Sequence, residues 1–140
     1  MFDFTDRLVT YEHAALLKQL GFQQKETNSG YHTTEMVYCI DADENGDHHI
    51  CHRYPACYEF DRHICAPTQN VARRWIKEMY HLDIFVESGG NSDYNVRVPG
   101  KWLGTGYKTY EDAMEDGIDF ILVKKYMIQK SYHMSVIKIL

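Results

Sequence analysis

The dipeptide Asn45-Gly46 lies between two runs in which apolar and polar residues alternate, and this segment constrains the fold more than any other. Asn-Gly favours a two-residue hairpin turn because both positions tolerate positive φ, and alternation is typical of half-buried strands. The segment therefore predicts a β-hairpin. A two-residue turn would place Cys39 opposite His52 and would put Cys51 on the apolar, core-facing side.

The same segment contains side chains of the kind that bind metals. Asp41, Asp43 and Asn45 fit the first oxygen ligands of a calcium-binding EF-hand loop, and Gly46 fits its sharp turn. His52, however, stands where that loop needs a bidentate glutamate. The flanking residues also alternate like strands, whereas an EF-hand needs helices there. Calcium binding is therefore not expected.

Zinc is the second metal to consider, because residues 39–65 contain all four cysteines and four of the eight histidines. Structural zinc sites usually draw their cysteines from close pairs such as Cys-x-x-Cys, and no such pair occurs in the sequence. We therefore predict no metal and no cofactor. If a metal does bind, the predicted site begins with Cys39 and His52. One further side chain, from Cys57, His63 or Cys65, would complete it.

Three helices are predicted from capping residues and from the spacing of apolar side chains. The first begins after Thr10 as N-cap and ends at Gly21, and the second opens at Ala66-Pro67-Thr68. The third starts at Thr109, with Asp112 three residues later as an approximate capping box. Gly117, inside the third helix, either lets a strand approach closely or is simply tolerated there. The predicted buried positions of the three helices are Leu16, Leu17 and Leu20; Val71, Ala72, Trp75, Ile76 and Met79; and Ala113, Met114, Ile118, Ile121 and Leu122.

Two further strands are predicted in the second half of the chain. Apolar residues alternate over residues 84–86 and again over residues 94–98, and the Gly-rich residues 89–91 suit the turn between them. Pro99-Gly100 ends the second run. Together with the helices, these strands predict an α+β fold with an antiparallel sheet of about four to five strands and three helices packed mainly on one face.

Residues 1–130 are predicted to form a single α+β domain, and residues 131–140 an apolar C-terminal extension rich in β-branched residues. Because an uncovered hydrophobic strand at a terminus promotes aggregation, the extension is expected to form an extra strand or to be covered by another copy of the chain. The protein is therefore expected to be a homo-oligomer.

Composition narrows the location and the class of partner. The formal net charge of -5 argues against a general binder of duplex DNA, whose affinity comes mainly from basic side chains. The sequence has neither a long apolar run nor a signal-peptide pattern at its start, so we expect a cytoplasmic protein without membrane contact. In that compartment cysteines are typically free thiols or metal ligands.

A candidate ligand surface follows the last predicted strand, where cations and aromatic residues are interleaved. Such a mixture suits stacking combined with anion contact, as in the recognition of nucleotides or single strands. The alternative is an ordinary connection from strand to helix with an anchoring tryptophan. The residues predicted to bind a ligand are Arg97, Lys101, Trp102, Tyr107 and Lys108, together with Arg73 and Arg74.

No motif of an established enzyme class occurs. The Gly-rich residues 103–108, LGTGYK, lack the spacing of a phosphate-binding loop, and there is no nucleophile elbow, dinucleotide fingerprint or His-Glu-x-x-His motif. Cysteines and histidines could form a nucleophilic pair, but the sequence does not show that they meet. We therefore expect a protein without catalytic activity and assign no catalytic residue.

Three segments resemble a group of small, largely uncharacterised proteins from gut Bacteroides-type bacteria and their phages. They are DRLVTYEHAALLKQLGF, CAPTQNVARRWIKEMYHLDIFV and GYKTYEDAMEDGI, which together cover more than half of the chain. The Ala-Pro-Thr motif, followed by the tryptophan and the I-x-V element, is the most specific part. The tail after Lys130 departs from the shorter members of the group. The resemblance implies no activity, only a context of small accessory genes in phages and mobile elements.

That context leads to the functional expectation. Accessory proteins of this kind often counter host defences by binding a signalling nucleotide or an effector protein. We therefore expect a non-enzymatic protein that binds or sequesters a small nucleotide-like ligand or a protein partner. A sequence-tolerant nucleic-acid-binding protein, using Arg73, Arg74, Lys77, Arg97 and Lys101, is the first alternative. A phage structural or interaction module is the second.

Overall fold

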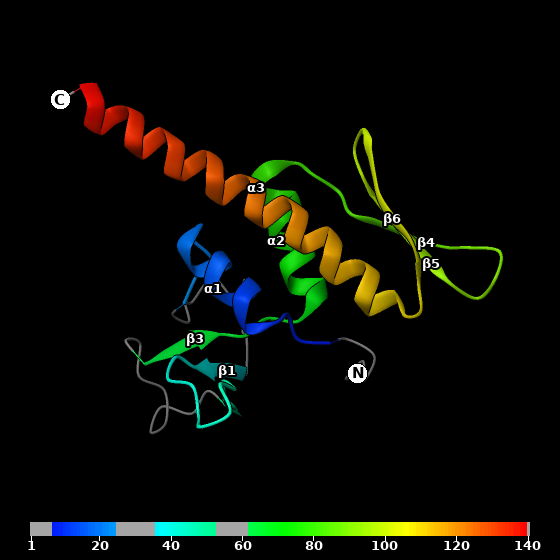
Figure 1. The fold of residues 1–140 in the computed structure, drawn as a ribbon, viewed down its shortest axis with the longest axis horizontal. Helices are drawn as coiled ribbons and strands as arrows, with labels where there is room; N and C mark the ends of the chain where they lie inside the picture. Colours follow the sequence, from blue (N-terminus) through cyan, green and yellow to red (C-terminus); the bar gives the residue numbers. More distant parts are fainter. Residues whose placement is uncertain (1–6, 25–35, 53–61, 140) are drawn as a thin grey trace.

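The computed structural model describes residues 7–24, 36–52 and 62–139, and it confirms the α+β class (Figure 1). The strands of the described part form two separate antiparallel sheets of three strands each, in the orders β2-β1-β3 and β4-β5-β6, instead of the single sheet expected. In chain order the elements are α1 (Tyr11–Gln19), β1 (Met36–Cys39), β2 (Ile50–His52), β3 (His63–Cys65), α2 (Gln69–Tyr80), β4 (Phe85–Ser88), β5 (Tyr94–Val98), β6 (Lys101–Tyr107) and α3 (Tyr110–Ile139).

The two sheets lie at different places along the helical layer. α1 contacts β3 on one side and α3 on the other, so it separates the sheet β2-β1-β3 from the long helix (Figure 1). The first half of α3 packs against all three strands of the sheet β4-β5-β6. The last turns of α3 project beyond the rest of the molecule (Figure 1).

The hairpin of β1 and β2 exists, but its predicted register is wrong. The Cα partner of His52 is Met36, and the Cys39 amide donates instead to the His49 carbonyl at 2.8 Å. The connection is longer than two residues: the Asp43 amide donates to the Asp47 carbonyl at 2.9 Å, which closes a turn around Asn45-Gly46. Because side chains alternate along a strand, the changed register moves Cys51 off the face that carries Tyr38.

α1 begins at its predicted cap, Thr10, and α2 begins where Ala66-Pro67-Thr68 predicted the start of a helix. The hydroxyl oxygens of Thr10 and Thr68 accept hydrogen bonds from the His13 and Val71 amides at 3.2 and 3.3 Å, respectively. Ala72, Trp75 and Ile76 of α2 are buried as predicted. Met79 is not: it is 53% exposed, because it lies in the last turn of α2 at the edge of the packed stripe.

β6 was not predicted as a strand. Pro99-Gly100 does not simply end β5, because Val98 and Lys101 are paired across it in a two-residue hairpin. Gly100 has φ of +78°, which suits the third position of a type II turn after proline. Gly104 and Gly106 made the run look like a loop, since glycine is depleted in strands.

α3 begins as predicted, with the Asp112 amide donating to the Thr109 hydroxyl at 3.1 Å, and its five predicted core residues are all buried. Gly117 lies directly over the sheet: a Cβ atom there would be 2.5 Å from Cγ2 of Ile84 and 3.1 Å from Cγ2 of Val96. Gly117 therefore lets the helix and the sheet approach closely. The extension 131–139 continues α3 as a helix, so the predicted extra strand is wrong.

Candidate functional site

The outer face of the sheet β4-β5-β6 carries a row of large side chains that point away from α3. We define this outer face as Phe85, Glu87, Arg97 and Trp102. β5 is the central strand, and Arg97 is directly opposite Phe85 of β4 and Trp102 of β6. The neighbouring Val96 and Val98 point the other way, into the core. Strand alternation thus separates the buried valines from the exposed row.

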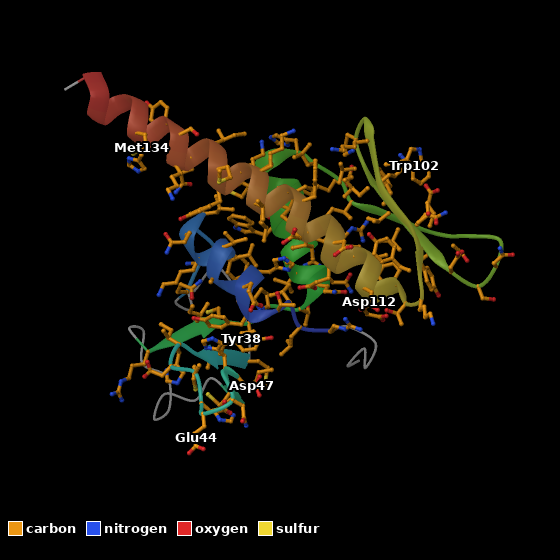
Figure 2. The ribbon with its side chains drawn as sticks, in the orientation of Figure 1. Tyr38, Glu44, Asp47, Trp102, Asp112 and Met134 are labelled. Atoms are coloured by element: carbon orange, nitrogen blue, oxygen red, sulfur yellow. The ribbon has the colours of Figure 1, made fainter. Side chains whose placement is uncertain are left out.

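Arg97 is held in place by three neighbours. Its Cζ atom lies 4.3 Å from the ring centroid of Phe85 and 6.0 Å from that of Trp102. Its Nε and Nη2 atoms each lie 3.0 Å from Oε1 of Glu87. The guanidinium group is therefore packed against two aromatic rings and paired with a carboxylate. Trp102 remains 59% exposed, and Figure 2 shows it on the sheet β4-β5-β6.

The other predicted ligand residues do not join this row. The Lys101 ammonium lies 4.9 Å from the ring centroid of Phe120, on the side that faces α3. The Tyr107 hydroxyl donates to Oδ2 of Asp116 at 2.6 Å, and this hydrogen bond raises the pKa of Tyr107 to about 12. Lys108 is exposed after the end of β6. The predicted set is thus divided, with only Arg97 and Trp102 on the outer face.

The two predicted arginines of α2 belong to another element. Arg73 is half-buried and Arg74 is exposed. On the same helix, the Lys77 ammonium lies 3.1 Å from Oδ1 of Asp83. The cations proposed for nucleic-acid binding are therefore distributed over α2 and both faces of the second sheet, and two of them, Lys77 and Arg97, are paired with carboxylates.

The acidic loop between β1 and β2 uses its own side chains for its turn. Oδ1 of Asp43 accepts hydrogen bonds from the Asn45 and Asp47 amides, each at 2.9 Å. The Asp47 and Asn45 bonds hold the pKa of Asp43 below its usual value. The elements on either side are the strands β1 and β2, so the loop differs from an EF-hand in its flanks and in the use of the Asp43 carboxylate.

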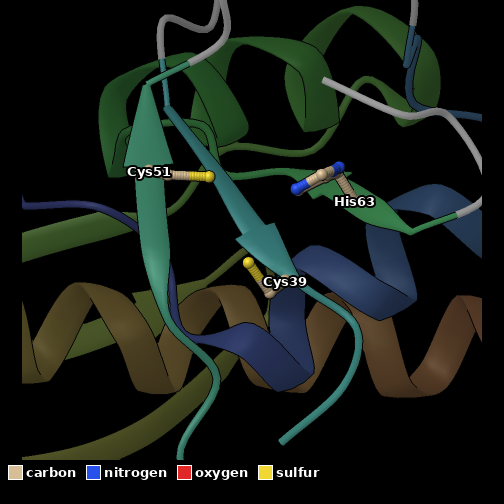
Figure 3. A group of neighbouring side chains, drawn as sticks. All are labelled: Cys39, Cys51 and His63. Atoms are coloured by element: carbon tan, nitrogen blue, oxygen red, sulfur yellow. The ribbon is translucent and has the colours of Figure 1, made fainter. Parts of the chain in front are cut away.

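Three metal-binding side chains meet on the first sheet, and they are not the predicted pair. Cys39, Cys51 and His63 each direct one ligand atom to a common region, where these atoms all lie within 4.8 Å of one another (Figure 3). Cys39 belongs to the predicted site and His63 was one of the side chains proposed to complete it. His52 is paired with Met36 in the observed register. Cys57 lies outside the described residues.

A buried polar network joins the three helices, and its central histidine was not predicted from the sequence. Nδ1 of His13 lies 2.6 Å from Oε1 of Glu115, and Nε2 lies 2.8 Å from Oδ1 of Asp119. The Glu115 carboxylate also accepts from the Thr10 amide at 2.8 Å and the Gln69 side chain at 2.6 Å. The spacing of His13 and Leu17, four residues apart on α1, indicates a shared buried face and was the available signal.

The network shifts the pKa values of both His13 and Glu115. Burial would lower the pKa of His13, but its hydrogen bonds to Glu115 and Asp119 outweigh burial and raise it. Burial would raise the pKa of Glu115, but the hydrogen bonds from His13, Thr10 and Gln69 hold it below its usual value. Both ring nitrogens face carboxylate oxygens, so a protonated His13 ring can donate to both and tie α1 to α3.

Comparison of this chain with protein-family models, curated proteins and solved structures found no match. Over residues 7–24, 36–52 and 62–139, every helix is too short or too polar to span a membrane. The function is therefore inferred from the residues and their geometry.

Proposed function

We propose that this chain is a non-enzymatic binding protein whose outer face, Phe85, Glu87, Arg97 and Trp102, recognises a protein partner. The observation that carries the proposal is the row Phe85, Arg97 and Trp102 across three adjacent strands, with Trp102 left 59% exposed. Tryptophan and arginine dominate the residues that contribute most to protein–protein affinity. Arg97 is already ordered by its neighbours, so binding costs less side-chain entropy there.

The geometry favours a protein over the other expected ligands. A small nucleotide-like molecule needs a concave site that covers most of its surface, whereas this row lies on an exposed sheet face. A phosphate would also have to compete with Glu87 for Arg97, since one carboxylate oxygen occupies both Nε and Nη2 at 3.0 Å. A single-stranded nucleic acid could stack on Trp102, but its backbone would meet the same carboxylate.

Residues of α3 support a second interaction, between copies of this chain. In its C-terminal half, α3 exposes Met127, Ile128 and Tyr132, by 56%, 53% and 71% respectively. All twenty Asp and Glu residues of the chain precede Phe120, whereas four lysines follow it. An apolar, basic helix end and an acidic remainder are complementary in charge. We therefore also propose that the end of α3 binds a second copy.

The resemblance to phage and mobile-element proteins suggests the biological setting. In that setting the partner of the outer face would be a host protein, for example an effector of a defence system, that this chain binds and sequesters. The setting depends on the resemblance alone, and the outer face does not depend on it.

Site-specific photo-crosslinking tests the outer face. A benzoylphenylalanine placed at position 102 and expressed in cells of a Bacteroides-type bacterium should yield a discrete adduct with one protein. The matched control is position 79, where Met79 is comparably exposed on α2. Adducts of the same pattern from both positions would contradict a specific outer face.

Thermal-shift screening separates the proposal from its alternatives. Cyclic and ADP-ribose-type nucleotides should leave Tm unchanged. Stabilisation by one of them that disappears in Trp102→Ala would replace the protein partner by a small ligand. Binding of an oligonucleotide that falls steeply with salt would favour the nucleic-acid alternative.

Sedimentation of Tyr132→Ser, compared with the wild-type chain, tests the self-association, which the substitution should weaken.

A further inference from the structure

The first sheet brings two thiols and one imidazole together from three different strands. Cys39 is on the central strand β1, and His63 is its direct partner on β3. Cys51 is on β2, opposite Val37, and therefore on the same face as Cys39. Each neighbouring strand thus contributes one side chain beside the cysteine of the central strand (Figure 3).

We propose that Cys39, Cys51 and His63 form a binding site for zinc or another thiophilic divalent metal. Two sulfurs and one imidazole nitrogen are a donor set that zinc prefers and that calcium and magnesium avoid. Two thiolates also balance the charge of a divalent ion. The ion and the two thiolates together carry no net charge. The desolvation penalty for placing the ion among these partly buried side chains is therefore small.

The distances suit a site that contracts slightly around an ion. Zinc binds sulfur at about 2.3 Å and nitrogen at about 2.0 Å, so tetrahedral ligand atoms are roughly 3.4 to 3.8 Å apart. The ligand atoms in the structure lie within 4.8 Å of one another. Rotation of the side chains that moves each ligand atom by about 1 Å brings these atoms to the spacing zinc needs, without a change in the strand register.

The three side chains fill three of the four tetrahedral positions. No other His, Cys, Asp or Glu of the described residues completes the group within the same distance. The fourth position is left to water or to another donor. Cys65 belongs to the same face of the sheet but is fully buried, and its thiol donates to the Gln24 carbonyl at 3.3 Å.

The metal would link all three strands of a small sheet. β1 has four residues and β2 and β3 have three each. Tyr38, Ile64 and Cys65 join β1 and β3 to the core, whereas Ile50 and Cys51 of β2 are exposed or half-buried. An ion bound to all three strands stabilises the folded state by mass action. Because thiols lose their protons on binding, affinity should fall on acidification.

Metal analysis of untagged protein, reconstituted under reducing conditions, tests the site. We expect one zinc per chain and, with cobalt(II), the thiolate charge-transfer and tetrahedral d–d absorption bands. Cys39→Ser, Cys51→Ser and His63→Asn should each lose the stoichiometric metal. His52→Asn and Cys65→Ser should retain it, since neither residue belongs to the group. His52→Asn is the matched control for His63→Asn.

Cobalt titration of the wild-type chain does not depend on whether a variant folds. Absence of cobalt and zinc uptake by the reduced wild-type protein would overturn the proposal. Loss of metal in His52→Asn with retention in His63→Asn would overturn it as well, because that result requires the two-residue turn. A disulfide between Cys39 and Cys51 in protein kept under reducing conditions would also contradict a metal site. None of these results affects the outer face.

Discussion

The buried network around His13 yields a quantitative prediction, because its two carboxylates differ in exposure. The Glu115 side chain is 12% exposed and that of Asp119 is 55% exposed. Removing one partner of a buried ion pair costs about 3 to 5 kcal/mol, whereas exposed pairs contribute at most about 1 kcal/mol. The same histidine therefore provides both a strong and a weak interaction.

The magnitude for Glu115→Gln follows from its three donors. The carboxylate accepts from the His13 ring, the Thr10 amide and the Gln69 side chain. A glutamine amide nitrogen cannot accept a hydrogen bond, so at least one of these donors loses its acceptor. Leaving such a buried donor unsatisfied costs about 1 to 3 kcal/mol of stability. His13 also loses its better-buried counter-ion but keeps Asp119. We expect a loss of about 3 kcal/mol in the free energy of unfolding, against about 1 kcal/mol or less for Asp119→Asn.

The pH dependence has a defined sign. The folded-state pKa of His13 is raised, so its stabilisation is complete below the unfolded value of about 6.5 and is lost as pH rises through the folded pKa. The folded-state pKa of Glu115 is lowered, so its stabilisation is present above about pH 4.5 and is lost as pH falls through the folded pKa. The stability difference between the wild type and His13→Asn should therefore shrink on the alkaline side.

Urea unfolding of wild type, Glu115→Gln, Asp119→Asn and His13→Asn, from about pH 5 to about pH 9, measures these differences. Equal losses for Glu115→Gln and Asp119→Asn would refute the assignment of Glu115 as the buried partner. If His13→Asn shows the same pH dependence of stability as the wild type, the raised pKa of His13 is refuted.

Three further predictions concern two glycines and one hydrogen bond. Gly117→Ala should destabilise the fold by about 1 kcal/mol, measured by urea unfolding, because overpacking against Ile84 and Val96 outweighs the helix propensity gained; stabilisation would contradict the close approach. Gly100→Ala should cost about 1 to 2 kcal/mol because φ is +78° there, while Gly90→Ala, with nothing within 4 Å of its Cβ position, should change stability little. Asp116→Asn should lower the pKa of Tyr107 from about 12 towards the ordinary tyrosine value, as followed by NMR of labelled tyrosine; an unchanged pKa would show that Asp116 is not the cause.

Local signals explain why the helices could be predicted. Thr10, Thr68 and Thr109 each provide a capping hydroxyl whose effect needs no knowledge of the rest of the fold. Periodicity then identified Ala72, Trp75 and Ile76 of α2 and the five core residues of α3 as buried, although it also included the exposed Met79. His13 was missed because it is polar, although it shares a face with Leu17.

The register of the first hairpin could not be predicted from its turn. β1 pairs with β3 as well as β2, and Cys39 faces His63, which is distant in sequence. Asp43 builds a longer turn around Asn45-Gly46 by accepting from two loop amides. The observed register therefore depends on both tertiary pairing and side-chain hydrogen bonds. In this register the candidate metal ligands are Cys39, Cys51 and His63, instead of the predicted pair Cys39 and His52.

The strand β6 and the helical tail 131–139 also differ from the prediction. In both cases the adjoining secondary structure determines the conformation of the segment. β6 contains two glycines but pairs along β5, and that pairing outweighs weak strand propensity. The tail is rich in β-branched residues but directly continues a helix, and adding a residue to an existing helix is far easier than starting a strand. The candidate binding residues were scattered for the same reason, since β6 directs Lys101 and Trp102 to opposite faces.

The affinity of the outer face for the partner identified by crosslinking is the most direct test of the proposed function. Titration calorimetry should show that Trp102→Ala weakens binding by at least about 30-fold, the loss typical of a central interface residue. Met79→Ala, the comparably exposed control on α2, should change the affinity by less than about 3-fold. Equal affinities for wild type and Trp102→Ala would contradict the outer face as the recognition surface.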